Sequence, residues 1–160
     1  MAKLLLTGEI NEQSLADLFL SIRTLEEKGA KKLNLHICSG GGEVEAALAM
    51  AHLIRTSSIH VIATNIGEVA SAALLVYLAA HEYKAAPFAS FMYHAPSCNL
   101  DEDDMMSHLD TAAQLRRDLD RFHKAMAYYS GAVFWAAWTN KRRDIYFDFE
   151  TLKKHLQKSS

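Results

Sequence analysis

The feature that most constrains this fold is a strand-type run followed by a helical run, three times in succession. The strand-type runs are apolar or alternate between apolar and polar residues. A strand, a crossover helix and a second strand in this order predict a parallel sheet with helices packed on it. The strand runs cover 4–6, 32–37 and 59–66, and the helical runs cover 11–29, 43–55 and the stretch that begins near residue 71.

The second half of the chain has a different pattern. Short strands are expected at 83–85 and 90–93, and a long helix is expected over 102–130. Apolar residues form a stripe along that helix while charged residues lie mostly between them, as in an amphipathic helix. With 160 residues, half of them apolar, the chain is long enough for one compact domain over residues 1–160.

Composition excludes several classes of function. A formal net charge of −2 gives no electrostatic basis for binding nucleic acid or an anionic membrane. The apolar stretches are too short for a membrane span or a signal peptide, so we expect a cytoplasmic protein. The eight histidines and two cysteines show no metal-ligand spacing, and two cysteines make no disulfide framework. We therefore expect no metal and no cofactor.

Ser71 is the strongest candidate for a reactive side chain. It lies in Gly-Glu-Val-Ala-Ser-Ala-Ala-Leu-Leu, residues 67–75, where a strand run gives way to a helix. A hydroxyl there lies beside the unpaired N–H groups of a helix start, which suits an acyl-transfer nucleophile. Serine is also a common helix N-cap, and taken alone Ser71 is more often a cap than a nucleophile.

Four segments together change that balance. They are Ser-Gly-Gly-Gly at 39–42, the Ser71 segment at 67–73, Met-Tyr-His-Ala-Pro at 92–96 and Arg-Asp-Ile-Tyr-Phe at 143–147. Their order and spacing resemble the proteolytic subunit of the Clp protease, and the resemblance extends from Leu4 to about Leu156. It implies an α/β, ClpP/crotonase-like fold with stacked parallel strands, crossover helices and a long handle helix through which two rings meet.

By this resemblance the chain is a serine endopeptidase with a catalytic triad. Ser71 is the nucleophile, His94 the general base and then the acid, and Asp144 the residue that orients the imidazole. Asp148 is the alternative third member. Each residue also has an ordinary interpretation, His94 as a surface-loop histidine and the aspartates as solvated charges.

The resemblance also implies how a peptide is held. The backbone N–H groups of Gly42 and Ala72 form the oxyanion hole. An extended polypeptide, either a peptide or an unfolded protein, lies between the glycine turn and the segment after His94. The residues expected to contact it are Gly41, Glu43, Val44, Cys98 and Leu100. A phosphate-binding loop is the weaker interpretation of the glycines, since no Walker-type lysine follows.

Departures from the family pattern bear on assembly. The family implies a homo-oligomeric ring, a heptamer or a double ring, but the segment after His94 lacks the family's glycines, which puts peptide grip and ring stacking in question. The first strand begins by Leu4, which leaves three residues for the pore loops that dock a Clp ATPase. We therefore expect activity on small or unfolded substrates without that ATPase. The alternatives are a crotonase-fold acyl-CoA enzyme and a non-catalytic ClpP-like scaffold.

Overall fold

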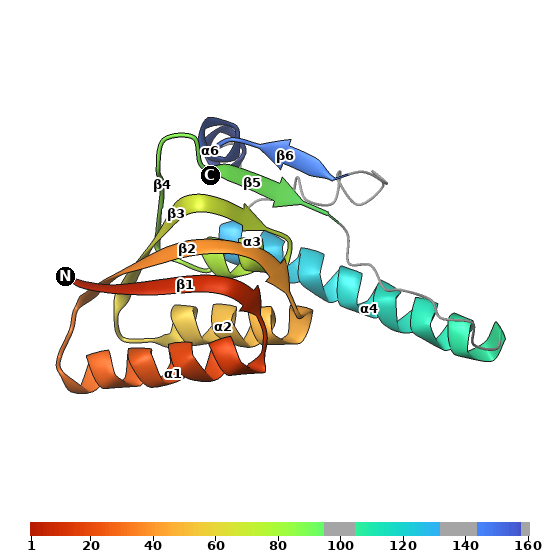
Figure 1. The fold of residues 1–160 in the computed structure, drawn as a ribbon, viewed down its shortest axis with the longest axis horizontal. Coiled ribbons are helices and arrows are strands. Elements are labelled where there is room, and N and C mark those ends of the chain that lie inside the picture. Colours follow the sequence, from red (N-terminus) through yellow and green to blue (C-terminus); the bar gives the residue numbers. More distant parts are fainter. Residues whose placement is uncertain (95–104, 132–143, 158–160) are drawn as a thin grey trace.

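The computed structural model describes residues 1–94, 105–131 and 144–157. Within these ranges the chain alternates strands and helices as expected, and Figure 1 shows the strands stacked into one sheet with helices packed against it. The elements are β1 (Ala2–Ile10), α1 (Glu12–Glu27), β2 (Lys32–Gly42), α2 (Val44–Thr56), β3 (His60–Ala70), α3 (Ala72–Leu78), β4 (Glu82–Ala85), β5 (Ser90–Tyr93), α4 (Met105–Ser130), β6 (Ile145–Phe147) and α6 (Phe149–Gln157).

The strands form one six-stranded sheet in the order β1-β2-β3-β5-β6, with β4 also paired to β3. The pairs of β1 with β2, β2 with β3, and β3 with β4 and β5 are parallel. Only β5 and β6 pair in the antiparallel sense among the described strands. The predicted parallel sheet with crossover helices is confirmed.

Strand β3 differs from the prediction because it does not end at Ile66. It continues through Gly67 to Ala70, pairing first with β4 over Ile62–Asn65 and then with β5 over Glu68–Ala70. The Asn65 side chain bridges the two halves, since its amide donates to Ser90 O at 2.8 Å and its Oδ1 accepts from Gly67 N at 3.0 Å. Gly67 is therefore accommodated inside the strand, and the strand delivers Ser71 directly at its carboxyl end.

Local sequence explains the first two helices. Asn11 and Ser14 form a capping box, in which Asn11 Oδ1 accepts from Ser14 N at 3.0 Å and Ser14 Oγ accepts from Asn11 N at 2.9 Å. Helix α1 buries Leu18 and Ile22. Helix α2 buries five residues at helical spacing, and both helices cover the same face of the sheet (Figure 1). The five are Ala46, Ala47, Met50, Ala51 and Ile54.

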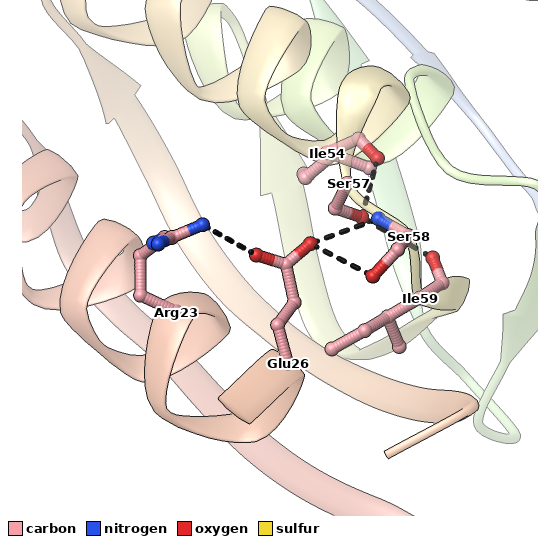
Figure 2. A network of polar contacts seen from close by, with 6 residues as sticks. All are labelled: Arg23, Glu26, Ile54, Ser57, Ser58 and Ile59. Atoms are coloured by element: carbon pink, nitrogen blue, oxygen red, sulfur yellow. Dashed lines mark hydrogen bonds and ion pairs between the residues drawn. The ribbon is translucent and has the colours of Figure 1, made fainter. Parts of the chain in front are cut away.

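The ends of α1 and α2 are joined by a polar network (Figure 2). One Glu26 carboxylate oxygen accepts from Ser58 N at 2.8 Å and from Ser58 Oγ at 3.1 Å, while the other pairs with Arg23 at 3.3 Å. The backbone hydrogen bond from Ser58 is the largest cause that lowers the pKa of Glu26. This carboxylate therefore holds the two helices together best when it is ionised.

Helix α3 is buried along its whole length, whereas α4 is not. All seven residues of α3 are buried, which makes it the centre of the core. In α4, Phe122 and Met126 are buried near the C-terminal end, and the other end extends away from the sheet (Figure 1). Arg55 on α2 donates to Tyr129 O at 2.8 Å and fixes the packed end. The structure describes α4 from Met105, within the expected 102–130.

Helix α6 was not predicted from the sequence. It begins directly after β6, where Asp148 Oδ1 accepts from Thr151 N at 2.8 Å, and it buries Leu152. Hydrogen bonds from the side chain and the backbone of Thr151 lower the pKa of the Asp148 carboxyl. Asp144 and Asp148 therefore have different environments: Asp144 precedes β6, whereas Asp148 caps α6.

Candidate active site

Ser71 has an unusual backbone conformation. Its φ of 52° and ψ of −126° lie in a region that non-glycine residues rarely adopt, and such strain concentrates at functional sites. The residue is fixed on both sides, since Ser71 N donates to Met92 O at 2.9 Å and Ser71 O accepts from Leu74 N at 3.0 Å. Its hydroxyl does not cap α3, whose residues are all described. Ser71 thus occupies the N-cap position of α3, but its side chain does not make the capping hydrogen bond.

The sequence predicted a turn at the glycines 40–42, but they are the last residues of β2, and they lie against Ser71. A Cβ built on Gly41 would be 2.7 Å from Ser71 Cβ and 3.0 Å from Ala72 N. Buried Ser39 holds this end of β2 in place, because it accepts from Gly41 N at 3.1 Å and donates to Gly8 O at 2.6 Å. The serine of the Ser-Gly-Gly-Gly segment thus connects β1 to the glycine end of β2, a role that the sequence interpretation did not assign.

Gly42 and Ala72, the predicted oxyanion-hole residues, lie on the two sides of Gly41. A Cβ on Gly42 would be 2.2 Å from Ile10 O, and the next amide, Glu43 N, donates to the same oxygen at 2.8 Å. The N–H of Gly41 is used by Ser39, so it is not available to an oxyanion. The Cβ position of Gly41 is next to the Ala72 amide, and a role of the Gly42 and Ala72 N–H groups as two converging donors stays a prediction.

His94 directly follows β5, which is the neighbour of β3. Met92 pairs with Ala70, so Ser71 and His94 leave adjacent parallel strands at the same edge of the sheet. Both are half-buried, and both line one pocket of about 580 Å³. The pocket also contains Gly42, Glu43 and Val44, three residues predicted for the peptide site; its remaining described lining residues are Gly40, Glu45, Thr111, Gln114, Leu115, Asp118 and Phe122.

Asp144 directly precedes β6, the antiparallel partner of β5. Tyr93 pairs with Ile145, so the next position in this register places Asp144 opposite His94. Residues opposite each other in such a ladder have Cα atoms about 4.5–5.5 Å apart. Asp144 is exposed and Asp148 caps α6, so the register favours Asp144 as the partner of His94.

One predicted substrate residue that the structure describes does not line this pocket. Gly41 faces Ser71 but lines a second pocket of about 370 Å³, together with Cys38 and Glu68. Cys98 and Leu100 lie outside the described residues. Conversely, the sequence interpretation missed the side of the pocket formed by α4; the signal was present as the recurrence of 111, 115, 118 and 122 at helical spacing.

A partly buried pair links α4 to β5, the strand that precedes His94. The Tyr93 hydroxyl hydrogen-bonds His123 Nε2, and the two ring centroids are 5.7 Å apart. Burial raises the pKa of Tyr93 to about 12 and lowers the pKa of His123. The pair is therefore neutral near pH 7 and holds α4 against the end of β5.

A family profile described as Clp protease matches residues 1–153. The chain belongs to the Clp protease family. ATP-dependent Clp protease proteolytic subunit 2 of Borreliella burgdorferi is 33% identical over 96 residues, which are 58% of this chain and 48% of that protein. The chain thus matches about half the length of this curated relative.

A solved structure gives the fold of this Clp-family chain independently. A mutant of ClpP1 from Listeria monocytogenes has a TM-score of 0.82 and 24% identity, and the match covers 96% of this chain and 86% of that one. The expected ClpP-like α/β fold is confirmed. In the parts of the chain described, no helix is long and apolar enough to cross a membrane.

Proposed function

We propose that this Clp-family chain is a serine endopeptidase that hydrolyses small or unfolded polypeptides with Ser71, His94 and Asp144. The observation that carries the proposal is the pairing of a strained serine, whose hydroxyl does not cap its helix, with a histidine in the same pocket. A purely structural serine has no need of this backbone conformation, which costs of order 1–3 kcal/mol.

The reaction would follow from the positions of these groups. The Ser71 hydroxyl attacks the carbonyl carbon of the peptide bond while His94 takes its proton. The N–H groups of Gly42 and Ala72 stabilise the oxyanion of the tetrahedral intermediate. His94 then gives its proton to the leaving amine, and water hydrolyses the acyl-enzyme by the same steps.

Asp144 would act on His94 rather than on the substrate. An acid opposite the imidazole holds one tautomer in place and stabilises the imidazolium that forms when His94 takes the proton. The antiparallel register of β5 and β6 supports this assignment, and the helix-capping bonds of Asp148 argue against the alternative.

The substrate and assembly are part of the same proposal. An extended peptide would lie along residues 41–44 and toward the segment that contains Cys98 and Leu100. Family membership supports a homo-oligomeric ring, either a heptamer or a double ring, and light scattering of the purified protein measures its mass. Action without a Clp ATPase stays a prediction; degradation of a folded substrate only when the ATPase and ATP are added would contradict it.

A labelling experiment separates this function from its alternatives. A fluorophosphonate probe should label the wild-type protein at Ser71, identified by peptide mass spectrometry, and Ser71→Ala should abolish both labelling and peptide hydrolysis. Ser57→Ala is the matched control, because Ser57 lies at the end of α2 and its hydroxyl donates to the backbone oxygens of Ile54 and Ile59. A wild-type protein that neither reacts nor cleaves peptides would favour a scaffold or an acyl-CoA enzyme.

A further inference from the structure

One face of α4 forms a wall of the candidate active-site pocket. Its lining residues recur every three or four positions, so they share one side of the helix. Across the pocket that contains Ser71 and His94 they face residues 42–45, at the end of β2 and the start of α2. A substrate side chain next to the bond being cut would enter between these walls. The α4 residues are Thr111, Gln114, Leu115, Asp118 and Phe122.

The inner part of this pocket is apolar. Phe122 is buried, while Leu115 and Val44 are partly buried, and all three line the pocket. Such a surface suits a chain of methylene groups. Lysine and arginine have such a stem and keep the charged head at its far end.

Carboxylates surround that apolar part. Glu43, Glu45 and Asp118 line the pocket, and none of its described lining residues is lysine or arginine. The Asp118 side chain is 25% exposed and is held by the Gln114 amide, which donates to its Oδ1 at 2.8 Å. This carboxylate is therefore positioned rather than freely rotating.

Arg121 compensates only part of this negative charge. Its guanidinium binds both carboxylate oxygens of Glu45, and one of its nitrogens lies 4.0 Å from Asp118. Glu43 makes no ion pair with any residue that the structure describes. One cation against three carboxylates leaves the pocket negatively charged.

We propose that this pocket selects a lysine or arginine side chain next to the cleaved bond, with Asp118 and Glu43 as the residues that determine specificity. The inference rests on the proposed peptidase function, and it concerns the pocket that Ser71 and His94 line. The methylene stem packs on Leu115 and Phe122 while the cationic head reaches the carboxylates. An acidic side chain is disfavoured by repulsion from the same groups.

The test uses fluorogenic tripeptide amides that differ only in the residue before the cleaved bond. Lysine is compared with norleucine, which keeps the stem without the amine, and with Nε-acetyl-lysine, which keeps the length without the charge. We expect kcat/KM to be about fivefold higher for lysine, as a partly exposed ion pair provides. The preference should fall as salt rises to about 1 M, where charges are screened within about 3 Å.

Variants identify the groups responsible. Asp118→Asn and Glu43→Gln should each reduce the lysine-to-norleucine ratio, and the double variant should bring it close to one. Asp120→Asn is the matched control, because Asp120 lies on the same helix, pairs with Lys124 and does not line the pocket; it should keep the ratio. Cleavage of the norleucine substrate measures catalysis without the charge interaction. A variant that folds but has lost the preference for lysine therefore shows a lower lysine-to-norleucine ratio of kcat/KM.

The outcomes separate the two claims. Equal cleavage of the lysine and norleucine peptides, or a ratio unchanged by Asp118→Asn and Glu43→Gln, would overturn the specificity and leave the peptidase function standing. Failure of the wild-type protein to cleave any of the peptides, combined with no fluorophosphonate labelling, would overturn the peptidase function and the specificity with it.

Discussion

Gly41 lies so close to Ser71 that a Cβ on the glycine would be 2.7 Å from the serine Cβ, well inside van der Waals contact. The same Cβ would be 2.9 Å from Ala70 O, and the φ of Gly41 is 102°. Neither obstacle is the movable end of a flexible side chain. The backbone conformation at the glycine end of β2 and the position of the candidate nucleophile Ser71 are therefore coupled.

This contact predicts that Gly41→Ala displaces Ser71. A shift of about 1 Å at a reacting group costs about 10²-fold in rate, so we expect kcat/KM for peptide hydrolysis and the rate of fluorophosphonate labelling to fall by about that factor. Gly40→Ala is the control for adding a methyl group to this end of β2, since a Cβ there meets no described atom within 4 Å. It should leave the melting temperature unchanged. Equal labelling rates in Gly41→Ala and the wild type would contradict the coupling.

The roles of the two aspartates near β6, Asp144 and Asp148, should be distinguishable by measurement. Asp144→Asn should lower kcat, because an amide opposite His94 favours the wrong tautomer, and should leave the melting temperature unchanged since Asp144 is exposed. Asp148→Ala should lower the melting temperature by removing the cap of α6 and should spare kcat. Both quantities are measured on each purified variant. The reverse pattern would make Asp148 the third member of the triad.

The Tyr93–His123 pair predicts a pH dependence of stability. The pKa of His123 is lowered in the folded protein by burial, so below the unfolded value of about 6.5 the unfolded chain binds a proton that the folded chain resists. Stability should therefore fall as the pH falls from about 7.5 to about 5.5. Urea denaturation at several pH values measures this loss.

Substitution of His123 tests the origin of that loss. His123→Gln retains an amide nitrogen or oxygen near the Tyr93 hydroxyl but does not titrate, so the fall in stability over this range should be smaller than in the wild type. His52→Gln is the control, because His52 is an exposed histidine on α2, and its pH profile should match that of the wild type. Identical profiles for His123→Gln and the wild type would exclude His123 as the source.

Local patterns were sufficient for most of the fold. The alternation of strand and helix runs predicted the parallel order, and Asn11 and the apolar spacing after it predicted α1. Gly67 was misleading, because a strand end was expected where β3 continues. Its N–H donates to the Asn65 side chain, and a Cβ at this position would be 3.0 Å from Cys38 Sγ. The Asn65 amide in turn donates to Ser90 O, and both Ser90 and Cys38 are distant from Gly67 in sequence, so local propensity does not contain these contacts.

The sequence predicted the candidate catalytic residues but not the α4 residues that line the pocket. Ser71, Gly42 and His94 carry recognisable local motifs, and the structure brings all three to one pocket. Asp118 and Gln114 belong to no such motif. In the sequence they are polar residues of an ordinary amphipathic helix, and only the packing of α4 places them at the pocket. The choice between Asp144 and Asp148 likewise depends on the pairing of β5 with β6 and on the cap of α6, which single-sequence patterns do not give.

Strain at Ser71 predicts a difference between two variants that both lack the hydroxyl. Alanine must keep the φ of 52° and ψ of −126°, whereas glycine adopts this region at no steric cost. The relief of about 1–3 kcal/mol exceeds the extra chain entropy that glycine loses on folding, about 1 kcal/mol at most. Ser71→Gly should therefore be more stable than Ser71→Ala by about 1 kcal/mol, although neither should hydrolyse peptides.

Chemical denaturation of the two variants side by side measures this difference, because both lack the same hydroxyl and any shared loss cancels. The wild type should fall close to Ser71→Ala, since both hold a side chain at the strained position. If Ser71→Gly were instead the less stable variant, the backbone at residue 71 would be relaxed in solution, and the strongest structural argument for Ser71 as a nucleophile would be lost. A higher stability of the inactive glycine variant would mean that the fold keeps a serine here at the expense of its own stability, as expected for a catalytic residue.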